Sequence, residues 1–131
     1  MTAKRTYAAA VLRCSPDEFE QLVADALDAI PPELGERMDN VVVLVEDRPT
    51  AEQLRDNPDG LLGLYEGVDL TERSPFDSGL MPDRITIFRL PHLAEATSWD
   101  DLADLVYETV IHEVAHHFGI DDDRLEELGW D

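Results

Sequence analysis

Apolar residues recur at helical spacing near the start of the chain, between residues 16 and 30. Ser15 suits the N-cap, Pro16 suits the first helical position, and Glu18 completes a capping box. The apolar face consists of Phe19, Leu22, Val23, Ala26, Leu27 and Ile30. Two prolines follow, and because proline cannot continue a helix, we predict that the helix ends before Pro31.

A second helical pattern runs from residue 99 to residue 118. Ser98 again suits the N-cap, and an acidic residue, Asp101, follows three positions later. Gly119 stands where a residue of left-handed conformation commonly caps the C-terminus of a helix. A last short helix is expected from residue 121 or 122 to residue 128.

Three shorter runs predict strands. Residues 41–45 are a continuous run of Val and Leu, which predicts a strand buried on both faces. Residues 61–65 predict a second strand. Residues 84–89 alternate apolar and polar side chains, which indicates a third strand with one solvated face, and Pro91 is expected to end it.

The remaining segments complete the expected organisation. One short helical turn is expected at residues 51–55. The long connection from residue 66 to residue 83 is either a binding loop or lid, or a surface loop without a specific role. The order of helix, strands and helices predicts one α+β domain over residues 1–131. Residues 1–14 are expected to be loosely ordered or to form a strand.

The chain is strongly acidic, with 30 Asp and Glu against 10 Lys and Arg and a net charge of −20. This charge argues against nucleic acid or an anionic membrane as a partner. It is typical of a solubilising acidic coat, and it also concentrates cations without specificity. The single cysteine, Cys14, excludes an internal disulfide and cysteine-rich zinc sites. Because the chain has neither a membrane-length apolar run nor a secretory signal, we expect a cytoplasmic protein.

The candidate chemistry lies in the second helix, at His112-Glu113-Val114-Ala115-His116. The two histidines are one helical turn apart on the same face, so their imidazoles can bind one metal ion together. Glu113 occupies the position at which a zinc peptidase carries its general base. The helix itself is predicted from its cap and its apolar period, independently of this motif.

A zinc site of this kind needs a third protein ligand from another element. Gly119 allows a sharp turn after His116, and Asp122 then completes the spacing His-Glu-x-x-His-x-x-Gly-x-x-Asp, which is the metzincin spacing with aspartate in place of the third histidine. Asp122 could instead simply favour the positive end of the last helix. A distant downstream glutamate has little room in this chain, and Glu126 is the remaining candidate of that kind.

Two further histidines lie near these residues. His117 projects off the ligand face, so it is expected to support the site from behind or to lie at the surface. His92 follows a predicted strand and is expected to be structural, with a role in the site as the alternative.

The chemistry that the motif predicts is metal-assisted hydrolysis. With three protein ligands, Zn²⁺ keeps a fourth position for water, and Glu113 would accept the proton of that water and pass it to the leaving amine. The strand at residues 84–89, if it lies at a sheet edge above the helix, could align an extended peptide by backbone pairing.

The chain resembles a family of small bacterial zincin-like proteins, the minimal metalloproteases. The resemblance covers most of the chain from Ser15 onward and is most specific near the C-terminus. The residues that carry it are 19–23, 30–34, 39–43, 65–67, 70–73, 82–88, 112–120, 122, 124–125 and 128–130.

The resemblance implies a zincin-like α+β fold, in which a small mixed sheet packs against an N-terminal helix and an active-site helix, with a short C-terminal helix. It also implies zinc held by His112, His116 and Asp122, with Glu113 as the catalytic base. The chain departs from true metzincins, which carry a methionine turn after the third ligand, because all its methionines lie upstream of the motif.

The leading interpretation is a monomeric, zinc-dependent metallopeptidase that acts on a peptide or protein substrate. The alternative is a metal- or peptide-binding zincin-like module without catalytic turnover, and the third interpretation is a structural or interaction protein with incidental histidines. Zinc content separates the third from the first two, and substitution of Glu113 separates the first two from each other.

Overall fold

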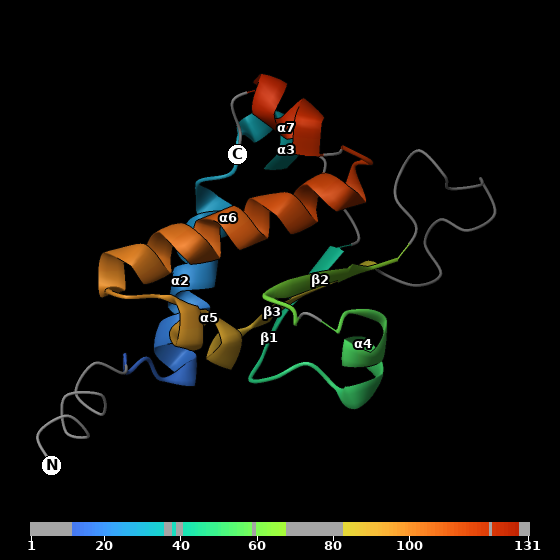
Figure 1. Ribbon diagram of the computed structural model, residues 1–131. Helices are drawn as coiled ribbons and strands as arrows, with labels where there is room; N and C mark the ends of the chain where they lie inside the picture. Colours follow the sequence, from blue (N-terminus) through green and yellow to red (C-terminus); the bar gives the residue numbers. More distant parts are fainter. Residues whose placement is uncertain are drawn as a thin grey trace, which may run out of the picture.

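The computed structural model describes residues 12–35, 38, 41–58, 60–67, 83–120 and 122–128, with the backbone alone for residues 122, 125 and 128. Within these residues, a small sheet is covered on one face by two helices (Figure 1). The elements in chain order are α2 (Pro16–Asp28), α3 (Pro32–Gly35), β1 (Val41–Glu46), α4 (Ala51–Asp56), β2 (Gly63–Glu66), β3 (Asp83–Phe88), α5 (Arg89–Glu95), α6 (Trp99–His117) and α7 (Asp122–Leu128). The predicted α+β class is therefore confirmed.

The sheet is mixed, as expected. Its strand order is β1-β3-β2, with β1 parallel and β2 antiparallel to the central strand β3. Successive side chains of a strand point to opposite faces of the sheet. Ile85 and Ile87 of β3 belong to the buried core, whereas Arg84 and Thr86 line a cavity on the other face.

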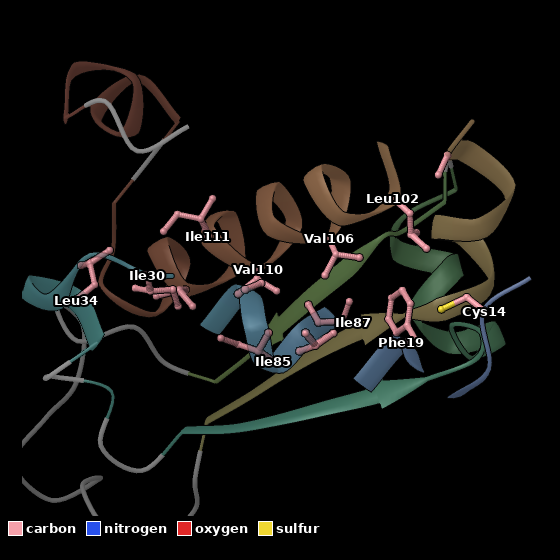
Figure 2. Packing of buried hydrophobic residues seen from close by; sticks show 14 residues of the cluster. Cys14, Phe19, Ile30, Leu34, Ile85, Ile87, Leu102, Val106, Val110 and Ile111 are labelled. Atoms are coloured by element: carbon pink, nitrogen blue, oxygen red, sulfur yellow. The ribbon is translucent and has the colours of Figure 1, made fainter. Parts of the chain in front are cut away.

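The core lies where α2 and α6 pack against the sheet and against each other (Figure 2). Phe19 of α2, Ile85 and Ile87 of β3, and Val106 and Val110 of α6 have no exposed surface. Each such side chain contributes about 1.5–3 kcal/mol relative to an exposed one, so this layer is the main source of stability.

Ser15 caps α2 with the predicted capping box, because its hydroxyl accepts from the Glu18 amide and the Glu18 carboxylate accepts from the Ser15 amide.

The predicted burial of two strands is wrong. The run at residues 41–45 lies in β1, which pairs only with β3 within the described residues, and Val42 is 38% exposed. Conversely, β3 was expected to have one solvated face, yet Ile85, Thr86, Ile87 and Phe88 are all buried. The reason is the position of each strand in the sheet. Among the residues that the structure describes, β3 has neighbours on both sides and β1 has one, and side-chain alternation does not report which strand is central.

The third strand also ends earlier than predicted, because residue 89 already begins α5. Pro91 lies in the first turn of this helix, where a backbone N–H is not needed.

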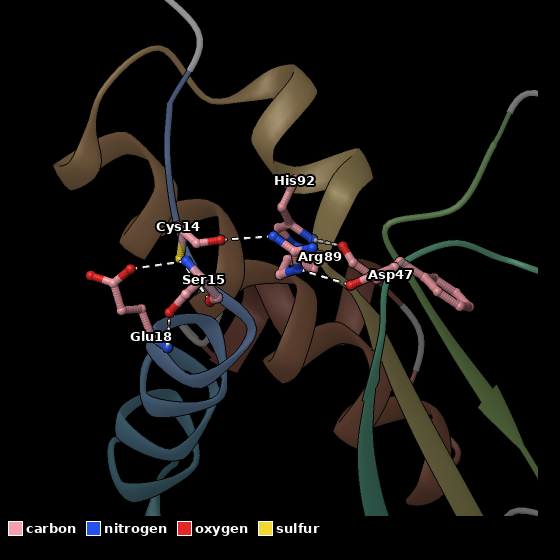
Figure 3. Close-up of polar contacts among 7 residues, drawn as sticks. Cys14, Ser15, Glu18, Asp47, Arg89 and His92 are labelled. Carbon is pink, nitrogen blue, oxygen red and sulfur yellow. Dashed lines mark hydrogen bonds and ion pairs between the residues drawn. The ribbon is translucent and has the colours of Figure 1, made fainter.

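The Arg89 guanidinium joins two remote segments: its Nε donates to Asp47 Oδ1 at 2.9 Å and its Nη1 donates to the carbonyl of Cys14 at 2.8 Å (Figure 3). The bond from Arg89 holds the pKa of Asp47 below its usual value of 3.8. This contact ties the start of α2 to the end of β1.

The sheet face away from α6 borders a solvent-open cavity of about 640 Å³ between the strands and α4. Leu44 and Leu64 lie among its lining residues with charged neighbours such as Glu46, whereas the His112–His116 segment does not line it.

None of the helices in the described ranges is long and apolar enough to cross a bilayer.

The predicted short helices at residues 51–55 and 122–128 are both present. The second predicted strand is shorter than expected and begins only at Gly63. Most of the N-terminal segment (residues 1–11) and most of the predicted long connection (residues 68–82) lie outside the described residues.

Candidate functional site

Helix α6 carries the candidate residues and is capped at both ends. The Ser98 hydroxyl accepts a hydrogen bond from the Asp101 amide at the N-terminus. At the C-terminus, Gly119 adopts φ +71°, the Gly119 amide donates to His116, and the Ile120 amide donates to Ala115. This pair of bonds is a Schellman motif, which requires the left-handed conformation that glycine adopts without strain. The predicted helix, its cap and the turn after it are thus confirmed.

His112, Glu113 and His116 lie along one side of α6 near its C-terminal end. His112 is partly exposed, the Glu113 side chain is 12% exposed, and the His116 side chain is 50% exposed. His116 Nδ1 and Glu113 Oε1 are 3.1 Å apart. Because a carboxylate accepts, the proton of a neutral His116 ring lies on Nδ1, which makes Nε2 the nitrogen with an unprotonated lone pair, suited to a metal.

Strand β2 approaches α6 beside Glu113 more closely than the sequence suggested. A Cβ at Gly63 would lie 2.7 Å from Thr109 Cγ2 and 3.2 Å from Glu113 Cγ. Only glycine permits this approach, so Gly63 places the edge of the sheet directly against the candidate base. A lone glycine inside a predicted strand is the sequence signal for such a close approach.

His117 lies on another side of the helix and is buried. The expectation that it could lie at the surface is therefore wrong. Its side chain is 1% exposed, and its Nδ1 lies 2.8 Å from Asp83 Oδ2 on β3. The hydroxyl of Tyr65 on β2 donates to the same oxygen at 2.7 Å. The imidazole of His117 also contacts the rings of Tyr65 and Phe118, both roughly perpendicular to it. His117 therefore connects α6 to the sheet.

His92 is structural, as expected, and is fully buried. Burial lowers the pKa of His92 below its usual 6.5, so the neutral ring is favoured. Its Nδ1–H donates to the Phe88 carbonyl at 2.7 Å, and its Nε2 lies 2.9 Å from the Thr109 hydroxyl. The hydroxyl also lies 2.9 Å from the Leu105 carbonyl, but its single proton goes to Nε2 when His92 is neutral. His92 thereby joins α5 to the middle of α6.

The donor set fits a zinc site in part. Two imidazoles one helical turn apart are suitable zinc donors, and a nearby carboxylate is the usual companion. Within the residues whose side chains are described, no group of three His, Cys, Asp or Glu could hold a metal ion, and Glu126 is exposed. Asp122 begins α7, two positions after the last residue of the Schellman turn, and its side chain lies outside the description. Asp122 as third ligand therefore stays a prediction.

Residues 38–130 match the sequence model of the zincin-like metallopeptidase family, and this match spans more than half of the chain. The chain belongs to this family. In this zincin-like protein, the family match includes the whole His112–His116 segment and the turn that follows it. The family resemblance inferred from the sequence is thus confirmed.

A solved structure supports the fold. The zincin-like chain is similar to a conserved hypothetical protein from Thermo thermophilus, with a TM-score of 0.55 and 24% sequence identity over 88% of this chain and 97% of that one. No curated protein is significantly similar to the zincin-like chain. The similarity to the solved structure concerns the arrangement of the elements alone.

Proposed function

We propose that this zincin-like protein is a zinc-dependent metallopeptidase that hydrolyses peptide bonds, with Glu113 as general base. The observation that carries the proposal is the grouping of His112, Glu113 and His116 along one side of α6, with Glu113 in contact with His116. Membership of the zincin-like metallopeptidase family supports it.

Each residue has a distinct role in this proposal. His112, His116 and Asp122 would hold the metal. When bound, zinc supplies a Lewis acid that polarises a carbonyl and lowers the pKa of a water molecule towards neutrality. Glu113 would accept a proton from the attacking water and donate it to the leaving amine. The largely buried position of its side chain keeps the carboxylate oriented and limits competing contacts with bulk water.

Substrate alignment is proposed for β2 instead of β3. The sequence interpretation placed an extended peptide along residues 84–89, but β3 is paired on both sides and has no edge to offer. Within the described residues β2 pairs only with β3, and Gly63 brings it against Glu113. An extended peptide added to this edge would pass beside the candidate base.

The experiment compares the unaltered protein with Glu113→Gln, using metal analysis and a library of fluorogenic unstructured peptides. Removing the base while keeping the shape should abolish hydrolysis and leave about one zinc per chain. Hydrolysis that persists in Glu113→Gln would remove Glu113 from the mechanism. Zinc binding without hydrolysis in the unaltered protein would instead support the alternative of a binding module without turnover.

The third ligand and the edge strand need their own measurements. Asp122→Ala should weaken zinc binding sharply and Glu126→Ala should not, since α7 begins at Asp122, two positions after the last residue of the turn. The reverse result would transfer the ligand role to Glu126. For the edge, a bound unstructured peptide should shift the NMR amide signals of residues 63–66. Shifts confined to β1 would contradict alignment on β2.

A further inference from the structure

We propose that Asp83, His117 and Tyr65 are positioning residues that hold the last turn of α6, and with it His116, in place against the sheet. The proposal rests on the proposed function insofar as His116 is a zinc ligand. The anchoring itself concerns the protein without metal and can be tested separately.

The three side chains meet at one buried oxygen atom. Asp83 Oδ2 accepts from His117 Nδ1 at 2.8 Å and from the Tyr65 hydroxyl at 2.7 Å. The side chains of His117 and Asp83 are 1% and 5% exposed. Burying a carboxylate is unfavourable unless it is hydrogen-bonded, so both donors are strongly held to it. Since the residues belong to α6, β3 and β2, this one atom joins three elements.

The position of His117 in α6 explains why this contact bears on metal binding. His117 is the last residue of the helix and follows His116 directly. Adjacent residues of a helix point about 100° apart, so His117 reaches into the protein while His116 faces solvent. The last turn of a helix frays more readily than its middle. A ligand placed there therefore needs an anchor, and the bond from His117 to the central strand provides it.

The backbone of Gly67 also lies close to the Asp83 side chain. A Cβ at Gly67 would lie 2.5 Å from Asp83 Oδ1, so the Gly67 backbone packs directly against the carboxylate. Gly67 has φ +154°, which glycine adopts without strain. A side chain at position 67 would therefore collide with the carboxylate that binds His117.

The other nitrogen of His117 shows that the Asp83 bond decides how this ring is oriented. His117 Nε2 is buried and has no hydrogen-bond partner among the described residues. The ring also makes roughly perpendicular aromatic contacts with Tyr65 and Phe118. The hydrogen bond from Nδ1 to Asp83 therefore decides how the imidazole is oriented. Without this bond, packing and the Schellman motif would still hold the last turn of α6.

Three variants of the full chain test the proposal. His117→Phe keeps a ring but removes Nδ1, and Tyr65→Phe removes only the hydroxyl. The control, Ser98→Ala, loosens the same helix at its other end by removing the N-cap bond. Amide hydrogen exchange of residues 114–118 is measured without metal, and the zinc dissociation constant is measured by competition with a chelator.

We expect His117→Phe to weaken zinc binding about 10-fold and to speed exchange in the last turn of α6 alone. Tyr65→Phe should produce the same pattern with a smaller amplitude, and it remains informative if His117→Phe does not fold. Ser98→Ala should change zinc affinity by less than about twofold, because distant sites contribute independently.

Two results would overturn the proposal. One is unchanged exchange in the last turn in both Tyr65→Phe and His117→Phe. The other is an equal loss of zinc affinity in Ser98→Ala, which would mean that general loosening of α6 is the cause. Absence of zinc binding by the unaltered protein would refute the proposed function instead, and the exchange measurement would still decide whether the network anchors the helix.

Discussion

Replacing Gly63 by alanine should destabilise the protein through a single methyl group placed between β2 and α6. The added Cβ would lie 2.7 Å from Thr109 Cγ2, 3.2 Å from Glu113 Cγ and 3.3 Å from the Thr86 carbonyl oxygen. Carbon atoms pack favourably at about 3.5–4.0 Å, so β2 must retreat by about 1 Å or Thr109 must rotate. Rotation would move the Thr109 hydroxyl away from His92 Nε2, now 2.9 Å distant.

The magnitude follows from these two routes. Overpacking a well-packed interior costs about 1–3 kcal/mol, and a lost buried hydrogen bond costs about 1 kcal/mol. Alanine offsets part of this loss, by about 0.4–1 kcal/mol, because it restricts the unfolded chain more than glycine does. We therefore expect a net loss of about 1–2 kcal/mol in the free energy of unfolding. Any hydrolytic activity should also fall, because Glu113 is displaced.

Urea denaturation of the matched variants measures this effect. Gly35 provides the control, since a Cβ there would contact nothing within 4 Å and its φ is not positive, so Gly35→Ala should be neutral or slightly stabilising. Thr109→Ser removes Cγ2 but keeps the hydroxyl, and in the Gly63→Ala background it should recover much of the lost stability. If Gly63→Ala is as stable as the unaltered protein, or if Thr109→Ser recovers nothing, the reasoning about this contact is refuted.

Two further predictions concern buried polar contacts. Because burial holds the pKa of His92 below 6.5 in the folded state, the unfolded chain binds its proton first as the pH falls. The contribution of His92 to stability should therefore be complete above pH 6.5 and decline below it. Between pH 7.5 and pH 5.5, the free energy of unfolding measured in urea should fall less in His92→Gln than in the unaltered protein. An equal fall in both proteins would contradict this prediction. Arg89→Met should lower the urea midpoint of unfolding more than Asp47→Asn does, because Arg89 also donates to the Cys14 carbonyl. Equal midpoints in the two variants would show that the bond to Cys14 contributes nothing.

The elements predicted well are those whose signals are local. Ser15 and Ser98 cap their helices through bonds to residues three positions later. At the end of α6, the Gly119 amide bonds to a residue three positions earlier and the Ile120 amide to one five positions earlier. Such contacts form within one or two turns of the chain, so residue types at fixed offsets are enough to predict them. The same locality places His112 and His116 on one face of α6.

The predictions that failed concern the neighbours of an element. The apolar run of β1 was expected in the interior, but in the described part of the sheet β1 is an outer strand and β3 is central. For His117, the surface alternative is wrong, because the side chain is buried against Asp83, which lies 34 positions away in the sequence. The pattern of a segment shows which of its faces are apolar, but it does not show what packs against them.

By itself, then, the sequence determined two capped helices, a His-Glu-x-x-His motif on one face of the second helix, and the glycine turn that leads towards Asp122. Only the tertiary structure decided that β3 is the central strand, that Gly63 brings the sheet edge against Glu113, and that Asp83 holds His117. The physical reason is the range of the interactions. Capping and helical periodicity act between residues a few positions apart, whereas strand order and buried hydrogen bonds join residues whose separation in the chain is bridged only by packing of the whole domain.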